Sequence, residues 1–211
     1  MVLTRILSKG KSLIRAFTLS VAGLKKGCLV SPFVWVSAAG TISMGQRVSV
    51  KGAKLNAQHG AIILADQVWL NDGVEINATH RIVIGTGTTV QRNVTINGEV
   101  SIGAECLFAP NVFVSSTSHV HDYFPGVGIR EQERRISKQD FLRHYNKPIE
   151  IGDDVWLGAN VVLMPGVKIG SHVVIGANSV VNIDIPSGTI AAGVPVRIIK
   201  KRPGFEGLAD A

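Results

Sequence analysis

The most reactive side chains of the sequence lie together in the stretch VSSTSHVHDYF, residues 114–124. His119 and His121 are one residue apart, and Asp122 and Tyr123 follow them directly. Because histidine titrates near neutral pH, it can act as a general base, bind a metal ion or remain an ordinary polar residue. The scaffold that positions this stretch decides among the three roles.

A six-residue repeat organises the chain on both sides of this stretch. Apolar residues recur at every sixth position in three blocks: Leu64, Leu70 and Ile76; Ile84, Val90, Ile96, Ile102, Phe108 and Val114; Ile151, Leu157, Leu163, Ile169, Ile175 and Val181. A second, mostly apolar column lies four residues after the first, with Ser179 as an exception. Since alternate residues of a strand share a face, each unit predicts a short strand and a corner. Three units close a coil of 18 residues, so fifteen units predict five coils, before irregular turns in residues 31–63 are counted.

Three further residues are interpreted from this register. The spacing between Ile76 and Ile84 is eight residues, which predicts a two-residue insertion. His80 then occupies an inward column, and we expect it to be a satisfied interior histidine. Cys106 also occupies an inward position and is expected in the core. Cys106 and Cys28 are far apart in a chain without a convincing signal peptide, which argues against a disulfide framework.

The repeat stops at Val114 and resumes at Ile151, which leaves 36 residues outside the register. Eleven of these are Asp, Glu, Lys or Arg, so the segment is expected to be solvated. Insertions of this length are usually functional. The two histidines lie at its root.

The repeat, together with the stretch IGAECLFAPNVFVSSTSHVHDYF, resembles the hexapeptide-repeat acyltransferases. The similarity is greatest to the galactoside, maltose and xenobiotic acetyltransferase branch and to polysaccharide or lipopolysaccharide O-acetyltransferases. It covers about residues 40–200 and implies an all-β fold, a left-handed parallel β-helix. Left-handed winding is taken from the family, because parallel crossovers are otherwise right-handed.

The resemblance also implies a chemistry. His119 would be the general base, located between two subunits of a homotrimer, and acetyl-CoA would be the co-substrate. The acceptor would be a hydroxyl, less often an amine, of a sugar in a surface polysaccharide or lipopolysaccharide precursor, with direct transfer in a ternary complex. His121, Asp122 and Tyr123 would contact the acceptor, and His121 is the alternative base.

The C-terminal repeats resemble the coenzyme A groove of the same family. The matching residues are Trp156, Ala159, Ala177, Asn182, Arg197 and Lys200. Small side chains at the two alanines would let a pantetheine arm lie against the coil, and the cations could meet phosphates. Many relatives carry Thr-Lys where this chain has Asn182-Ile183, so one contact of the family differs.

Two other readings of the scaffold remain open. One is a noncatalytic β-helix that binds or supports a partner. The other is a zinc enzyme like the γ-class carbonic anhydrases, for which His80, His119 and His121 are available. Histidines two residues apart in an extended segment point to opposite faces, which is poor for joint ligation, so no metal is expected.

The charge is concentrated at one end of the chain. The net charge is +7, yet residues 1–65 carry nine Lys or Arg and no acid, because the first acidic residue is Asp66. Residues 1–30 form a basic segment that can fold as a helix. Three roles are open: the segment would bind an anionic membrane surface, pack on the body as a solvated helix, or serve as a targeting peptide. The expected location is cytoplasmic, at the inner face of the membrane if the segment binds there. Nothing in the pattern indicates nucleic-acid binding.

The expected organisation follows from these boundaries. Residues 31–200 form the β-helix domain, with the active-site insertion at 115–150. Apolar runs are too short for a membrane-spanning helix. Pro186 and Pro195 end strand pairing in the last coil, and residues 201–211 form the C-terminal tail, of which residues 203–211 are expected to be disordered.

Overall fold

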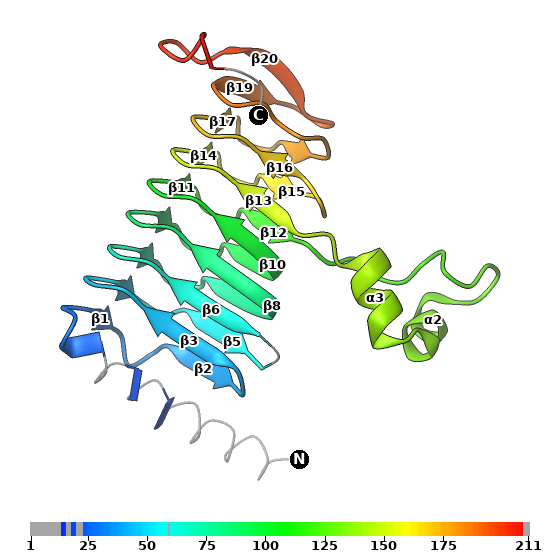
Figure 1. The fold of residues 1–211 in the computed structure, drawn as a ribbon, viewed down its shortest axis with the longest axis horizontal. Helices are drawn as coiled ribbons and strands as arrows, with labels where there is room; N and C mark the ends of the chain where they lie inside the picture. The colour runs from blue at the N-terminus through cyan, green and yellow to red at the C-terminus, as the bar shows by residue number, and fades with distance from the viewer. Residues whose placement is uncertain (1–13, 16–17, 20–22, 59, 209–211) are drawn as a thin grey trace.

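Short parallel strands joined by tight corners wind the chain into a three-sided solenoid, with an arm projecting from one corner (Figure 1). The computed structural model describes residues 14–15, 18–19, 23–58 and 60–208. The parallel solenoid confirms the predicted all-β fold class, and its hexapeptide repeats indicate left-handed winding.

We number the faces in the order in which the chain meets them. The first face contains β1 (Leu29–Val30), β4 (Ser49–Val50), β7 (Trp69–Leu70), β9 (Thr89–Val90), β11 (Leu107–Phe108), β14 (Trp156–Leu157), β17 (Val174–Ile175) and β19 (Thr189–Ala192). The second contains β2 (Trp35–Ala38), β5 (Lys54–Ala57), β12 (Phe113–Ser115), β15 (Val162–Leu163) and β18 (Val180–Val181). The third contains β3 (Thr41–Met44), β6 (Ala61–Leu64), β13 (Ile149–Ile151) and β16 (Lys168–Ile169). Two longer strands, β8 (Glu75–Ile84) and β10 (Thr95–Ile102), pass from the second face to the third.

The length of a turn differs between the two halves of the solenoid. On the first face, Ser49 pairs with Trp69, which is 20 residues later, whereas Trp156 pairs with Val174, 18 residues later. The prediction of 18-residue coils is therefore correct for the turns from β9 to β11 and from β14 to β17, whereas the turn from β17 to β19 is shorter, because Val174 pairs with Ile190, 16 residues later. Each of the eight parallel strands of the first face belongs to one turn, so irregular turns are present in addition to the five predicted coils.

The prediction for His80 is wrong. The extra residues of the 20-residue turn lie at the corner between the second and third faces, and there His80 projects into solvent with 70% of its side chain exposed. The inward columns resume at Ile82, which is buried. The insertion thus absorbs the change of register outside the core, and His80 is not an interior residue.

The inward columns form one continuous apolar core from Cys28 to Val196. The polar exception, Ser179, is fully buried, and its hydroxyl donates to the carbonyl of Gly176 at 2.6 Å and accepts from the amide of Gly193 at 3.0 Å. Cys106 lies in the core as predicted, and burial raises the pKa of its thiol to about 11. The thiol is therefore neutral near pH 7 and unsuited to act as a nucleophile.

Asparagines shape the corner between the first and second faces. Asn93, Asn111, Asn160 and Asn178 all have positive φ, a conformation that asparagine tolerates better than most residues. Their side-chain amides form a ladder along the solenoid axis, with donor–acceptor distances of 3.3, 3.1 and 2.9 Å between successive members. The corner of each turn is thus tied to the corner of the next.

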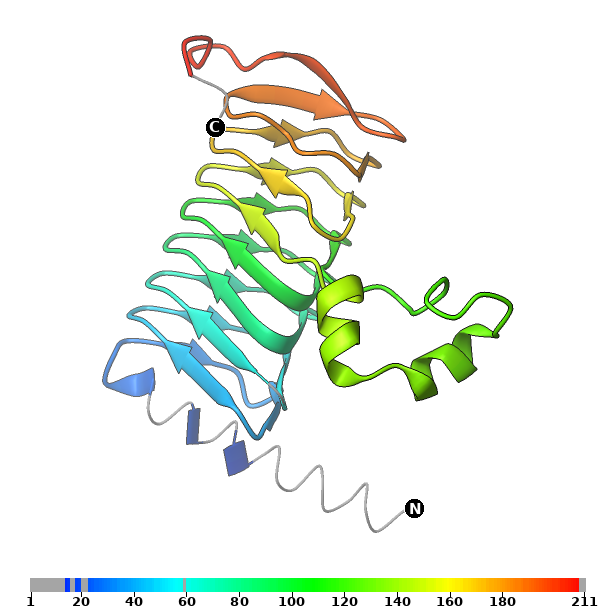
Figure 2. The same ribbon diagram turned by 45° about the vertical axis from the view of Figure 1, so that its right-hand side comes forward.

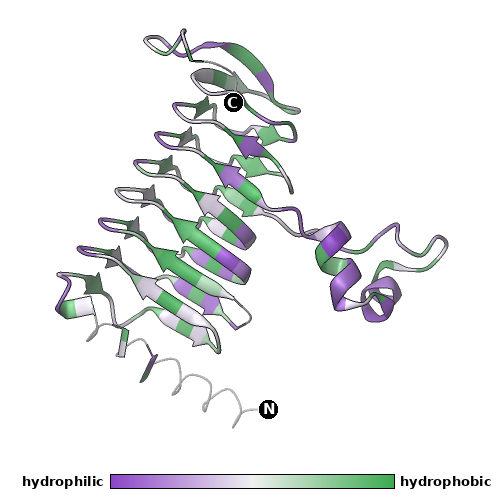
Figure 3. Cartoon of the chain, viewed as in Figure 1, coloured by the Kyte–Doolittle hydropathy of each residue, from purple (hydrophilic) through white to green (hydrophobic). Residues whose placement is uncertain are grey.

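The insertion forms the arm, which extends away from the coil in both views (Figures 1 and 2). It contains two short helices that the sequence register did not predict, α2 (Ile129–Arg135) and α3 (Lys138–Tyr145). Ser137 caps α3, because its hydroxyl accepts a hydrogen bond from the amide of Asp140 at 3.0 Å. Hydrophilic residues make up much of both helices, as expected for a solvated segment (Figure 3).

One buried amide holds the loop of the arm against α2. The side chain of Gln132, which is 1% exposed, donates to the carbonyls of His121 at 3.0 Å and Val127 at 2.7 Å. It also accepts from the amide of Phe124 at 2.9 Å. This side chain therefore satisfies three backbone groups of residues 121–127 at once.

The C-terminal end of the chain is more ordered than predicted. Residues 202–208 fold back on the coil, because the ring of Phe205 stacks on His172 with centroids 4.4 Å apart and Arg202 pairs with Asp154 at 2.8 Å. The prediction of a disordered tail is wrong for this part, and residues 209–211 lie outside the described chain. The strand β20 (Arg197–Lys201) pairs antiparallel with β19 and covers its open edge.

Most of the predicted N-terminal segment lies outside the described residues. Residues 14–15, 18–19 and 23–24 are helical, and Leu19 packs against the core. No helix in the described part of the chain is long and apolar enough to cross a membrane.

Replacing Gln132 with leucine should loosen the arm and leave the coil intact. The substitution removes the partners of three backbone groups, each worth about 1–3 kcal/mol when buried. We expect amide hydrogen exchange of residues 121–127 to accelerate by roughly tenfold or more, with no change in the strands. Gln139→Leu on the exposed surface of α3 is the matched control. Equal exchange in both variants would show that Gln132 does not organise the loop.

Candidate active site

The arm leaves the coil through a short ladder, the neck, formed by residues 115–118 and 145–147. Thr117 pairs antiparallel with Asn146, and the amide of Ser118 donates to the carbonyl of Tyr145 at 3.1 Å. Ser116 and Asn146 are both buried, and the Ser116 hydroxyl donates to the Asn146 side chain at 2.6 Å. The Asn146 amide then donates to Glu99 on the preceding turn at 3.1 Å. The neck is therefore fixed to the rigid coil.

His119 lies directly beyond the neck, where its position is set from two sides. Its backbone follows Ser118, and its ring nitrogen Nδ1 forms a short hydrogen bond with the carboxylate of Glu133 on α2. Arg130 holds the other oxygen of Glu133 at 3.0 Å. The hydrogen bond from His119 is the main cause that lowers the pKa of Glu133 below its ordinary value.

This pairing determines which nitrogen of His119 can act as a base. An ionised carboxylate only accepts hydrogen bonds, so Nδ1 must carry the proton when the imidazole is neutral. Nε2 then keeps its lone pair and can accept a proton. The arrangement is that of a histidine oriented by an acid for general-base chemistry.

His119 lines a cleft of about 660 Å³ between the arm and the second face. The arm and neck contribute Thr117, Ser118, His119, Val120, Glu133 and Phe141, and the coil contributes Asn97, Phe113, Ser115, Val162, Leu163, Met164 and Pro165. Phe113 and Met164 are each about two-fifths exposed, so the wall opposite the histidine is partly apolar. An apolar wall with a few polar groups is typical of a small-molecule site.

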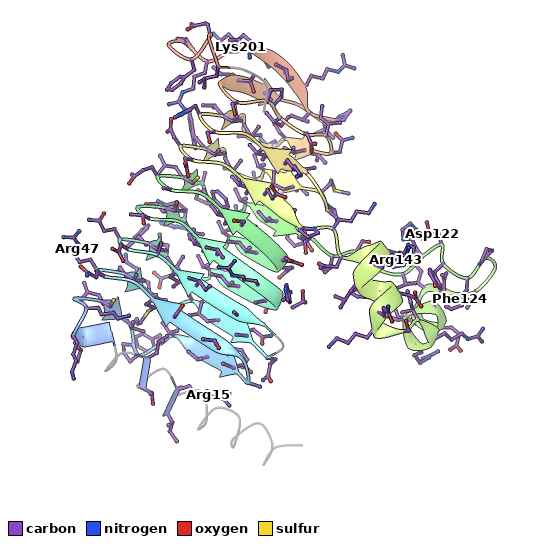
Figure 4. All side chains as sticks on the ribbon, in the orientation of Figure 1. Arg15, Arg47, Asp122, Phe124, Arg143 and Lys201 are labelled. Atoms are coloured by element: carbon purple, nitrogen blue, oxygen red, sulfur yellow. The ribbon has the colours of Figure 1, made fainter. Side chains whose placement is uncertain are left out.

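The three residues predicted to contact the acceptor, His121, Asp122 and Tyr123, contact other residues of the arm and neck in the single chain. His121 donates through Nδ1 to the carbonyl of His119 at 2.9 Å. Asp122 accepts a hydrogen bond from the hydroxyl of Tyr145, the largest cause of its lowered pKa, and it lies on the arm away from the coil (Figure 4). Tyr123 packs against Phe124 with ring centroids 4.9 Å apart. In the described chain these three side chains do not line the cleft, so their contact with an acceptor stays a prediction.

The predicted coenzyme A residues divide between two regions. Trp156 lies half-exposed on the first face, and Ala159 and Ala177 occupy one corner on successive turns, where the amide of Asn178 donates to the carbonyl of Ala159 at 2.8 Å. Arg197 and Lys200 are exposed on β20. Asn182 follows β18, at the corner between the second and third faces. Among the residues that the structure describes, none of the six lines the cleft of His119.

Glu133 and Gln132 are the functional candidates that sequence reasoning missed. Both lie in the charged run IREQERR, where neither differs from its neighbours in a recognisable way. Their roles appear only when α2 folds back on the neck. Within the described residues, no group of three or more His, Cys, Asp or Glu side chains could hold a metal ion.

Comparison with known proteins agrees with this geometry. The family model described as bacterial transferase hexapeptide (six repeats) matches residues 148–182. The putative lipopolysaccharide biosynthesis O-acetyl transferase WbbJ of Escherichia coli (strain K12) is 35% identical over 167 residues, which cover 77% of this chain and 72% of that protein. The galactoside O-acetyltransferase of the same strain is 36% identical over 140 residues, or 65% of this chain.

These alignments do not cover the relatives completely. The matched region spans 63% of the galactoside O-acetyltransferase, less than two thirds of its length. Among solved structures, the polysialic acid O-acetyltransferase OatWY superposes with a TM-score of 0.54 at 23% identity, covering 86% of this chain and 93% of that chain. That likeness supports the fold. The predicted class, an acetyltransferase, agrees with the names of these relatives, and the chain belongs to the hexapeptide-repeat acetyltransferase family.

Proposed function

We propose that this protein transfers an acetyl group from acetyl-CoA to a hydroxyl of a sugar, with His119 as general base. The observation that carries the proposal is the pairing of His119 Nδ1 with Glu133, which leaves Nε2 free in a residue that lines a cleft. A hydroxyl is favoured over an amine because the relatives reported above are named O-acetyltransferases. A sugar of a surface polysaccharide or lipopolysaccharide precursor remains the proposed acceptor.

The proposed reaction is a direct transfer. Nε2 of His119 removes the proton of the sugar hydroxyl as its oxygen attacks the thioester carbonyl, which forms a tetrahedral intermediate. The intermediate collapses, the carbon–sulfur bond breaks, and the imidazolium returns the proton to the thiolate of coenzyme A. Glu133 stabilises the imidazolium and keeps the ring in one tautomer. Cys106, buried and neutral, is not available as an acyl carrier.

The test is a screen of sugar acceptors for thiol release from acetyl-CoA, followed by variants. His119→Ala should lower kcat/KM by roughly 10²–10⁴-fold, the usual worth of general-base catalysis. Glu133→Gln keeps the shape but removes the charge, and we expect a loss of roughly tenfold in kcat, since the imidazolium loses its counter-ion. Glu131→Gln is the matched control, because Glu131 pairs with Arg134 and Arg135 on the same helix.

Full activity of His119→Ala would refute the mechanism. Equal losses in the two glutamate variants would show that the effect belongs to helix α2 in general. If no acceptor released thiol and calorimetry detected no coenzyme A binding, the noncatalytic β-helix would be the better reading.

The proposal includes the predicted homotrimer with a shared site. The cleft of His119 lies between the arm and the second face, whereas Trp156 lies on the first face, so one chain does not bring the base to this predicted coenzyme A residue. A second copy that places its first face beside the cleft would complete the site. The family resemblance supports this arrangement.

Mixing two inactive variants tests the shared site. His119→Ala and Trp156→Ala subunits, denatured together and refolded, should form mixed trimers in which roughly a quarter of the sites have both native residues. We expect activity to reappear at about that fraction of the native value. If activity stays at the level of the separately refolded variants, each site is built within one chain.

The basic N-terminal segment is proposed to bind an anionic membrane surface, where lipid-linked sugars are assembled. In the described residues, Ile14, Leu24, Leu29 and Phe33 are exposed at this end of the solenoid, with Phe33 84% exposed. Arg15 and Arg47 lie at the same end (Figure 4), and no acidic residue precedes Asp66. Apolar side chains beside cations suit an anionic interface.

Vesicle flotation tests this surface. The full chain should bind vesicles of phosphatidylcholine with phosphatidylglycerol at low salt and release at high salt, because exposed charges are screened. Deletion of residues 1–27, or the double substitution of Arg15 and Lys25 by glutamate, should abolish most of the binding. Binding that survives both changes would contradict the proposal.

A further inference from the structure

A second cavity, the groove, runs along the third face of the solenoid. Its volume is about 770 Å³. It is lined from β8, β10, β13 and β16 and from the segment after β18. Parallel strands lie about 4.8 Å apart, so five successive turns give a groove roughly 20 Å long. It can therefore hold several units of an extended chain along the solenoid axis.

The lining of the groove indicates what kind of chain fits. Most aliphatic residues of its lining are buried in the core, and its rim carries three carboxylates and two cations, namely Glu99, Glu150, Asp184, Arg81 and Lys168. The formal charge of the rim is −1, from three negative and two positive groups. A nearly neutral rim of strong hydrogen-bonding groups favours a neutral polyhydroxylated chain, while a polyanion would meet uncompensated carboxylates.

Part of the rim is already paired across turns. The ammonium group of Lys168 forms an ion pair with Glu150 at 3.2 Å. The backbone amide of Lys168 donates a hydrogen bond to the carboxylate of Asp184 at 2.8 Å. These groups are held in place by the coil, so binding a hydroxyl would cost them little ordering. The carboxylates keep further lone pairs as acceptors for sugar hydroxyls.

The groove ends next to the catalytic cleft. The strand β10 turns the corner between the second and third faces, with Asn97 in the lining of the cleft and Glu99 in the lining of the groove. Two residues span at most about 7 Å. Between them Gly98 has φ +95°, and a Cβ there would lie 2.0 Å from the hydroxyl of Ser116 in the neck. Only glycine lets the neck sit this close to the corner.

His80 lies at the same corner, one turn earlier. Its Nε2 is 4.0 Å from Glu99, and its side chain is largely exposed. The exposed corner of the 20-residue turn thus forms a polar edge between the groove and the cleft. A chain lying in the groove would pass this edge to bring its last unit to His119.

We propose that the groove binds the glycan chain of the acceptor, a neutral oligosaccharide whose terminal sugar reaches the cleft around this corner. The inference rests on the proposed sugar acetyltransferase function and specifies its substrate as a chain, in preference to a free monosaccharide or a polyanionic glycan. His80 contacts the sugar that crosses the corner.

Ser101→Trp tests the groove by filling it. Ser101 is exposed on β10 in the middle of the groove, and its side chain points outward from a strand that tolerates aromatic residues. The matched control is Ser43→Trp. Ser43 occupies the same outward column, since it pairs with Ile63, Ile63 with Val83 and Val83 with Ser101, but it lies outside the groove.

Binding is measured by nuclear magnetic resonance with neutral tetrasaccharides of galactose, glucose and N-acetylglucosamine, with their monosaccharides, and with oligosialic acid. At least one neutral tetrasaccharide should bind the native protein roughly tenfold or more tightly than its monosaccharide, a difference of about 1.4 kcal/mol. Ser101→Trp should remove this difference, and Ser43→Trp should keep it. Lys168→Ala should also weaken tetrasaccharide binding. Lys54→Ala, which removes a different ion pair between turns, is its control and should leave binding unchanged.

Three results would overturn the inference. The native protein could bind tetrasaccharides no more tightly than monosaccharides, tetrasaccharide binding could be unchanged in Ser101→Trp and Lys168→Ala, or the protein could bind oligosialic acid more tightly than the neutral tetrasaccharides. A change of oligomeric state in Ser101→Trp by sedimentation would show that a second copy covers this face. Thiol release measured on the same samples separates the two proposals. Transfer without chain-length preference contradicts the groove alone, whereas tetrasaccharide binding without transfer contradicts the proposed function alone.

Discussion

Stacking of backbone hydrogen bonds between successive turns is the constraint on which the rest of this structure depends. Each short strand pairs with the turn before it and the turn after it, so a change in one turn must be accommodated before the next begins. Extra residues are therefore confined to corners. The short insertion at His80 and the long insertion of the arm both lie at the corner between the second and third faces.

This confinement explains how a long insertion can hold the proposed base, His119, in a defined position. The arm leaves and returns at neighbouring points, and the neck joins both points to the coil through Ser116, Asn146 and Glu99. His119 is the first residue beyond the neck, so it takes its backbone position from the rigid coil. Its ring orientation comes from Glu133 on the arm. Position and tautomer are thus set by two separate elements, and the cleft forms where they meet.

The features that repeat could be predicted from the sequence, because a column of inward residues is visible without any tertiary information. The apolar columns, the buried Cys106 and the limits of the insertion all follow from the six-residue period. Features that depend on contacts between distant segments could not be predicted in this way. Glu133 meets His119 only because α2 folds toward the neck, and Phe205 packs on His172, which belongs to an earlier turn.

The error at His80 has a specific physical origin. A period of six was continued through an insertion, but the inserted residues were absorbed at the corner, which moved His80 from an inward column to the surface. The same corner now separates the groove from the cleft. A residue that was expected to pack in the core is thus a candidate contact for substrate, and the departure from the repeat coincides with the proposed functional region.

The most direct measurement for this account is the distance between Nε2 of His119 and the acceptor oxygen in a crystal structure with coenzyme A and an acceptor sugar. The account predicts a hydrogen-bonding distance of about 2.6–3.2 Å, with Nδ1 still bonded to Glu133. An acceptor oxygen bonded to a different basic side chain, with His119 turned away from the cleft, would contradict it.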